Sequence, residues 1–295
     1  MRFLVTGTNG QLGYDVVKEL KRRGFNDVLE YDRNIMDITN PRQVEQCIVE
    51  SEPDVVIHCA AYTAVDNAED DESKAREVNK IGTRNIAQMT DLIGAKLIYV
   101  STDYVFDGEK PYPQTYAVDD AVNPLSIYGK TKYEGEQEAK FNPMHFIVRT
   151  SWVFGINGKN FVKTMLNQVG KREEVNVVAD QYGSPTYTVD LARLLVDMSL
   201  TDKYGTYHAN NEGYITWADF AEDIYEVNGV KMKVNHITTE EYPTKAKRPH
   251  NSCLNKDCLD KAGFKRLPDY KDALKRYSEE LKQQQLEDTK KLELK

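Results

Sequence analysis

Short, mostly apolar runs recur at intervals through the first half of the chain. Each is bounded by polar residues or glycine, which is typical of strands buried on both faces of a parallel sheet. We predict five such strands, over residues 3–6, 28–31, 55–59, 97–101 and 146–150.

Between these runs, apolar residues follow a helical spacing. The first stripe begins at Leu12 and stops at Gly24, a common helix terminator. Asn40-Pro41 begins a second predicted helix, because proline fits the first helical turn. A third helix covers residues 75–89. Alternation of strands and helices over about 150 residues predicts an α/β protein with a doubly wound parallel sheet of the Rossmann type.

The second half of the chain has a weaker pattern. Residues 175–178 are strand-like, but loops rich in Gly, Pro and Asn separate the remaining elements. We therefore predict a dinucleotide-binding Rossmann domain over residues 1–155 and a smaller C-terminal α/β lobe, mainly for substrate binding, over residues 156–295. Elements are free to cross between the two. The tail from residue 283 is expected to be an exposed helix end or disordered.

The composition is that of an ordinary globular protein, with 40% hydrophobic and 29% charged residues. No apolar run is long enough to cross a bilayer, and the first residues lack the apolar core of an export signal. The four cysteines form no C-x-x-C pair, so we expect neither a disulfide framework nor a zinc site. These features favour a cytoplasmic protein with no membrane partner.

The charge balance bears on the choice of partner. A formal net charge of −8 argues against nucleic acid, whose binding proteins usually present a basic surface. An anionic small molecule remains compatible with this balance if local cations hold it. Lys245, Lys247 and Arg248 form the most obvious basic cluster.

A glycine-rich segment follows the first predicted strand and opens the first predicted helix. Its glycines are Gly7, Gly10 and Gly13. Such a loop allows a tight turn, a close approach of the backbone to a pyrophosphate, and close packing of helix on strand. The helix N-terminus then offers free N–H groups to the phosphates. An isolated glycine pattern is weak, but the strand-to-helix context favours a dinucleotide site.

Charged residues near the end of the second predicted strand bear on the choice of cofactor. Asp32 lies where a carboxylate usually holds the adenosine ribose, and Arg33 beside it suits a 2′-phosphate. A solvated loop pair is the alternative for both. Asp37 follows, beside Ile38, and it either meets the adenine edge or caps the helix that begins at Asn40-Pro41.

A Tyr and a Lys four residues apart supply the candidate chemistry. Tyr128 and Lys132 share one face of a predicted helix. We expect the ammonium to lower the pKa of the phenol, so that Tyr128 donates a proton near neutral pH. Thr102, at the end of the fourth predicted strand, supplies a hydroxyl where open parallel sheets bind ligands.

Together these motifs resemble the extended short-chain dehydrogenase/reductases and, within them, the dTDP-4-dehydrorhamnose reductase family. The resemblance implies an enzyme that uses NADPH, or NADH, to reduce the 4-keto group of dTDP-4-dehydro-6-deoxy-L-mannose to dTDP-L-rhamnose. It leaves a homodimer open. The matching segments span most of the chain and cover residues 7–13, 58–66, 101–108, 128–132, 149–155, 180–186 and 247–252.

The resemblance also implies roles for individual residues. For Asn79 a satisfied core amide, and for Trp152 a core aromatic, remain alternatives. The implied catalytic triad is Thr102, Tyr128 and Lys132, and the implied substrate contacts are Val65, Thr102, Tyr104, Trp152 and Arg248. The implied cofactor contacts are Gly7, Asn9, Gly10, Gln11, Leu12, Gly13, Asp32, Arg33, Asp37, Ile38, Ala60, Ala61, Thr63, Asn79, Tyr128 and Lys132.

Other functions on this fold remain open. An epimerase or dehydratase would act on a related nucleotide sugar, but a dehydratase usually has Asp-Glu after the catalytic Thr, whereas Asp103-Tyr104 stands here. A non-catalytic relative, the regulatory subunit of methionine adenosyltransferase, is a further alternative. Reductases of this kind are sometimes described with an interfacial magnesium held by carboxylates, but we match no such ligands and predict no metal.

Overall fold

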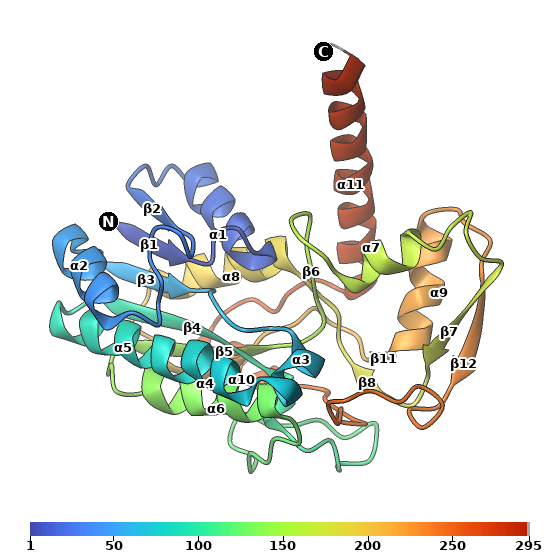
Figure 1. Ribbon diagram of the computed structural model, residues 1–295, viewed down its shortest axis with the longest axis horizontal. Coiled ribbons are helices and arrows are strands. Elements are labelled where there is room, and N and C mark those ends of the chain that lie inside the picture. Colours follow the sequence, from blue (N-terminus) through green and yellow to red (C-terminus); the bar gives the residue numbers. More distant parts are fainter. Residues whose placement is uncertain (294–295) are drawn as a thin grey trace.

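A six-stranded parallel sheet forms the centre of the computed structural model, which describes residues 1–293 (Figure 1). The strand order is β10-β5-β4-β3-β1-β2. The order reverses at β1, and open α/β sheets bind ligands outside the strand ends beside such a reversal. The strands are β1 (Phe3–Thr6), β2 (Val28–Tyr31), β3 (Val55–His58), β4 (Lys96–Thr102), β5 (His145–Thr150) and β10 (Gly205–His208).

Helices cover both faces of this sheet, with α1 and α8 on one face and α2, α5 and α6 on the other (Figure 1). Successive residues of a strand point to opposite faces of the sheet and pack against the helices on either side. Phe3 and Val5 belong to the core under α1, whereas Leu4 belongs to the core under α2. Burial on both faces explains why the strands are continuous apolar runs. The helices are α1 (Gln11–Arg22), α2 (Pro41–Ser51), α5 (Thr83–Leu92), α6 (Ile127–Ala139) and α8 (Thr188–Ser199).

Short elements connect the strand ends to these helices. Two of them depart from α-helical geometry, a π-helical segment and a single 3₁₀ turn, and both lie close to residues with predicted functions. The connecting elements are α3 (Val65–Asp70), α4 (Glu72–Arg76), the π segment η1 (Glu77–Gly82), the 3₁₀ turn η2 (Asp103–Val105) and α10 (Asp257–Ala262).

The second lobe has its own core, built largely from aromatic side chains. Phe154 packs against Tyr187, Phe220 and Tyr277 from three other elements of this lobe. Its elements are β6 (Val153–Phe154), α7 (Phe161–Leu166), β7 (Glu174–Val178), β8 (Tyr182–Gly183), β9 (Thr186–Tyr187), β11 (Ile215–Thr216), α9 (Trp217–Val227), β12 (Lys233–Ile237) and α11 (Tyr270–Glu293).

The five predicted strands of the first half are confirmed, each to within one residue at either end. The sixth strand, β10, was not predicted. Its sequence is short and half polar, and it comes after α8 in the less regular part of the chain. Because α8 packs on the central sheet and β10 is one of its strands, the two lobes interleave along the chain. The division near residue 155 stays a proposal.

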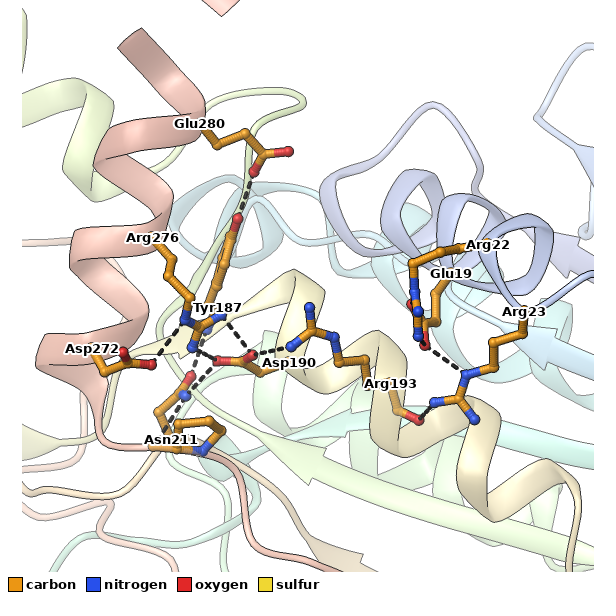
Figure 2. Close-up of polar contacts among 11 residues, drawn as sticks. Glu19, Arg22, Arg23, Tyr187, Asp190, Arg193, Asn211, Asp272, Arg276 and Glu280 are labelled. Atoms are coloured by element: carbon orange, nitrogen blue, oxygen red, sulfur yellow. Dashed lines mark hydrogen bonds and ion pairs between the residues drawn. The ribbon is translucent and has the colours of Figure 1, made fainter. Parts of the chain in front are cut away.

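Polar contacts join α1, α8 and α11 where the lobes meet (Figure 2). Arg276 on α11 donates two hydrogen bonds to the buried carboxylate of Asp190 on α8, at 2.9 and 2.7 Å. Arg23 at the end of α1 donates to the carbonyl of Arg193 on α8 at 3.1 Å. The last turns of α11 project from the body with exposed side chains up to residue 290 (Figure 1). Within residues 1–293, no helix has both the length and the apolar character needed to span a membrane.

Candidate active site

A cleft of about 850 Å³ runs along the carboxyl ends of the sheet strands and is closed on its far side by the second lobe. It is the place that the strand order favours for a ligand. Most of the predicted site residues lie in its wall: Gly7, Asn9, Gly10, Gln11, Leu12, Gly13, Asp32, Arg33, Asp37, Ile38, Ala60, Ala61, Thr63, Val65, Thr102, Tyr104, Tyr128, Lys132 and Trp152. Asn79 and Arg248 do not line it.

The glycine loop forms one end of the cleft. Gly7 has a φ of +69°, and a Cβ there would lie 2.7 Å from the backbone nitrogen of Ala60, so only glycine fits. Gly10 caps α1 without a side-chain hydrogen bond, and the first turn of α1 carries no acidic residue. The helix therefore presents unpaired N–H groups and its positive dipole end to the cleft, as a pyrophosphate requires.

A loop of the second lobe is tied to the glycine loop. The side-chain oxygen of Gln11 accepts hydrogen bonds from the Gly155 N–H and the Asn160 amide, both at 3.0 Å. The Asn157 amide donates to the carbonyl of Asn9 at 2.9 Å. The side chain of Gln11 therefore joins the two lobes. If Gln11 contacts the cofactor as predicted, the contact is made by its backbone N–H.

The carboxylate of Asp32 is held in a fixed position after β2. It accepts hydrogen bonds from the Asn9 amide at 2.7 Å and from the backbone N–H groups of Asn34 and Ile35 at 2.8 and 3.1 Å. The Ile35 bond in particular lowers the pKa of Asp32. An ionised, oriented carboxylate at this position suits a ribose hydroxyl.

The neighbouring Arg33 is largely free. Its side chain is 75% exposed, and its Nε lies 3.8 Å from a carboxylate oxygen of Asp37. Asp37 itself accepts from the N–H and the hydroxyl of Thr39, whereas Asn40 caps α2 through the N–H groups of its first turn. Of the two roles considered for Asp37, capping of this helix is wrong, because Asn40 is the capping residue.

Asn79 lies behind the cleft wall, in the π-helical segment. Its side chain accepts from the Tyr62 N–H at 2.8 Å and donates to the Tyr62 carbonyl at 3.2 Å and to Thr131 Oγ1 at 3.1 Å. The amide thus fixes the loop that contains Ala60 and Ala61 against helix α6. This placement makes Asn79 a positioning residue, because its hydrogen-bonding groups are already paired within the chain.

Helix α6 carries the Tyr and Lys of the predicted triad. Ser126 caps its N-terminus by accepting from the Gly129 N–H at 3.1 Å, so the helix begins immediately before Tyr128. Lys132 is 3% exposed, and its Nζ donates to the carbonyl of Val100 at 2.7 Å and lies 4.2 Å from the ring centre of Tyr99. Tyr128 and Lys132 therefore face the end of β4, where Thr102 lies.

The protonation of this group differs from the sequence-based expectation. Burial raises the pKa of Tyr128 to about 12, with a nearby hydroxyl of Thr102 partly offsetting the rise. Burial also lowers the pKa of Lys132 to about 7, although the charge of Glu136 opposes the change. The prediction that Lys132 lowers the pKa of the phenol is wrong here, because desolvation dominates both groups. A phenol with a raised pKa is protonated at neutral pH, which is the form that a proton donor needs.

Aromatic side chains of both lobes line the rest of the cleft. Tyr104 meets Tyr128 edge to face, with ring centres 5.6 Å apart. Trp152 has a positive φ of 47° and stacks on Trp217 with ring centres 3.6 Å apart. Sequence reasoning missed Trp217, and with it the cleft-lining residues Lys159, Phe161 and Phe220. No catalytic motif marks these positions, although Phe161 begins helix α7 and Trp217 and Phe220 lie on helix α9.

Arg248 lies half-buried beside the cleft. It donates from Nη1 and Nη2 to the carboxylate of Asp66 at 3.1 and 2.8 Å. The same carboxylate accepts from the Ala246 N–H at 3.1 Å, and Lys245 pairs with Asp70. Two members of the basic cluster, Lys245 and Arg248, thus fasten a loop of the second lobe to α3, whose first residue is the cleft residue Val65.

Among the described residues, no cluster of three or more His, Cys, Asp or Glu side chains could hold a metal ion. Even the buried carboxylate of Asp190, where α8 meets α11, is no free metal ligand, because it is hydrogen-bonded by Arg276 and Asn211. We assign no magnesium site to these residues and derive no step from such an ion.

The glycine loop, the fixed carboxylate after β2 and the Tyr–Lys pair of α6 beside a hydroxyl define an oxidoreductase of the extended short-chain dehydrogenase/reductase class. Comparison with known proteins narrows this assignment. The family described as RmlD substrate binding domain matches residues 1–283. A dTDP-4-dehydrorhamnose reductase of Aggregatibacter actinomycetemcomitans is 42% identical over 93% of this chain and 97% of its own length.

Solved structures agree with the sequence comparison. A dTDP-4-dehydrorhamnose reductase of Clostridium acetobutylicum is 44% identical, with a TM-score of 0.92 over 96% of this chain and 100% of that one. The enzyme of the same name from Bacillus anthracis, in complex with NADP, is 43% identical, with a TM-score of 0.91 over 95% of this chain and 99% of that one. The chain belongs to the dTDP-4-dehydrorhamnose reductase family.

Proposed function

We propose that the chain reduces the 4-keto group of dTDP-4-dehydro-6-deoxy-L-mannose, giving dTDP-L-rhamnose, with NADPH as the preferred reductant and NADH as an alternative. One observation carries the proposal: Tyr128, Lys132 and Thr102 lie in the same cleft as an uncapped helix N-terminus behind a glycine loop. Family relatives bear the name of this reaction, and one of them binds NADP.

The residues of the chain have distinct tasks in this reaction. The reduced nicotinamide, when bound, supplies a hydride to the keto carbon. Tyr128 donates its phenolic proton to the carbonyl oxygen as that oxygen gains negative charge. Lys132, held between the Val100 carbonyl and the Tyr99 ring, stabilises the charge that develops on the phenol in its cationic form, which predominates below its pKa of about 7.

The decisive experiment follows NADPH oxidation by the purified protein in the presence of dTDP-4-dehydro-6-deoxy-L-mannose. A panel of other nucleotide 4-keto sugars, with either NADPH or NADH, would define the base, the sugar and the cofactor. Stoichiometric formation of dTDP-L-rhamnose is the expected result. Conversion of the sugar without net oxidation of the cofactor would indicate an epimerase, and binding without any conversion would indicate a non-catalytic relative.

We also propose a cytoplasmic location. The four cysteines are free, as is usual in a reducing compartment. A homodimer, which the family resemblance leaves open, would be checked by analytical ultracentrifugation. Neither point affects the assignment of the reaction.

A further inference from the structure

Glu136 is a fully buried carboxylate of helix α6, one turn after Lys132, to which the mechanism above gives no task. It accepts hydrogen bonds from Nε and Nη2 of the buried Arg149 on β5, both at 2.8 Å, and from the Ser101 hydroxyl on β4 at 2.6 Å. His208 on β10, whose Nε2 lies 3.4 Å from Nη1 of the same guanidinium, is neutral because burial lowers its pKa to about 3. Desolvation makes a buried ion pair a weak source of stability, so the pair calls for another explanation.

The partners of Glu136 place its carboxylate where α6 meets the catalytic end of the sheet. Ser101 and Arg149 are neighbours in the register of β4 and β5. Ser101 lines the cleft and immediately precedes Thr102. The carboxylate therefore ties the end of β4 to the helix that carries Lys132.

Glu136 also places a negative charge near Lys132, since residues four apart on a helix are neighbours on one face. This charge opposes the fall in the pKa of Lys132 that burial causes. The other titratable groups around the ammonium are neutral at neutral pH, because burial lowers the pKa of an imidazole and raises those of a thiol and two phenols. They are His58 on β3, Cys59 after it, Tyr99 on β4 and Tyr128 on α6.

We propose that Glu136 is a positioning residue of the reaction, whose carboxylate keeps Lys132 in its ammonium form. The inference rests on the proposed function, in which that ammonium stabilises the charge that develops on Tyr128. An isolated carboxylate buried at this place would take up a proton and lose its effect. The paired hydrogen bonds of Arg149 hold it in the charged form, which gives the guanidinium its role.

The first test measures the pKa of Lys132 by NMR titration of the protein with isotopically labelled lysine, using Lys132→Met to assign the signal. Glu136→Gln removes the charge and keeps the size of the side chain, so the pKa of Lys132 should fall by about one pH unit. Glu138→Gln is the matched control and should leave that pKa unchanged. Glu138 is a buried carboxylate on the same helix, and Arg84 on α5 binds it through a similar fork, at 2.9 and 2.6 Å.

Steady-state kinetics with NADPH and the keto sugar provide the second test. At neutral pH a smaller fraction of Glu136→Gln carries the ammonium, so its kcat should be about fivefold below that of the wild type. At about pH 5 both enzymes carry the ammonium, and the difference should disappear. A loss of kcat that persists at this pH would assign Glu136 a purely structural role and overturn the inference.

A further variant guards against a failure to fold, because Glu136→Gln leaves a buried guanidinium unpaired. The double variant Glu136→Gln/Arg149→Met removes both charges, a change that buried ion pairs often tolerate, and it should also lower the pKa of Lys132. An unchanged pKa of Lys132 in either variant, or an equal fall in Glu138→Gln, would overturn the inference alone. A wild-type enzyme inert toward the keto sugar would overturn the proposed function, and the titration of Lys132 would still report on the charge of Glu136.

Discussion

The side-chain amide of Asn79 donates a hydrogen bond to Thr131 Oγ1 at 3.1 Å, which links the loop after β3 to the helix that carries Tyr128 and Lys132. The link runs through the π-helical segment, an irregularity that is frequent at functional sites. Because the same amide also pairs with both backbone groups of Tyr62, a single side chain fixes the relative position of the cofactor wall and of α6.

We expect Asn79→Ala to lower the free energy of unfolding by about 1–3 kcal/mol and to lower kcat about tenfold, since small shifts of a catalytic group are costly. Asn142→Ala is a matched control. Asn142 is also buried and makes three hydrogen bonds, to Thr90, Ala95 and Met144, away from the cleft. Denaturant unfolding should show a similar loss for both variants, and only Asn79→Ala should slow turnover. Unchanged kcat in Asn79→Ala would leave a core amide as its whole role.

Tyr128→Phe removes the phenolic hydroxyl and keeps the ring. We expect kcat to fall roughly 10²–10⁴-fold, the usual contribution of a general acid, with little change in NADPH affinity. Tyr133→Phe, on the same helix but outside the cleft, is the control and should retain wild-type turnover. Steady-state kinetics and a fluorescence titration with NADPH provide both readouts. Wild-type turnover in Tyr128→Phe would remove this residue from the mechanism.

Lys132 should make the free energy of unfolding increase as the pH rises above about 7. Its pKa falls from 10.5 to about 7 on folding, so the unfolded chain binds more protons between these values. Stability therefore rises with pH across this window, and burial of the ammonium is most costly below about pH 7. Lys132→Met should abolish much of this rise, weaken NADPH binding and lower kcat. Chemical denaturation at a series of pH values tests the first point. An identical pH dependence in both proteins would assign the rise to another group.

The sequence predicted the first half of the fold well because continuous apolar runs and a glycine loop have few alternative structures. It missed β10, whose Gly205–His208 segment is partly polar and lies 50 residues or more beyond its neighbour β5 in the chain. It also missed Trp217, since the stacking on Trp152 depends on a tertiary contact. The pKa of Tyr128 could not be predicted either, because the extent of burial is a property of the folded cleft.

Arg248 is an implied substrate contact and a cation of the predicted basic cluster, which makes the substrate phosphates its natural partner, but its guanidinium is engaged with Asp66 across the lobes. If the ion pair positions α3 at the cleft, Arg248→Ala and Asp66→Asn should each raise KM for the nucleotide sugar about 3–30-fold. The double variant should add little, because coupled residues are not additive. Direct phosphate binding predicts a different result, in which only the loss of Arg248 raises KM. Initial-rate kinetics at saturating NADPH distinguish the two.

Cofactor preference depends on Arg33, whose exposed side chain makes only a 3.8 Å ion pair with Asp37 and is free to turn toward a 2′-phosphate. A guanidinium binds a phosphate through paired, charge-assisted hydrogen bonds. We therefore expect Arg33→Ala to raise the KM for NADPH about tenfold while the KM for NADH changes less than about twofold. The wild-type preference for NADPH should also weaken as salt is added, because exposed charges are screened. Arg42→Ala, an exposed arginine at the start of α2 and outside the cleft, is the control. Equal weakening of both cofactors by Arg33→Ala would show that this residue does not bind the 2′-phosphate.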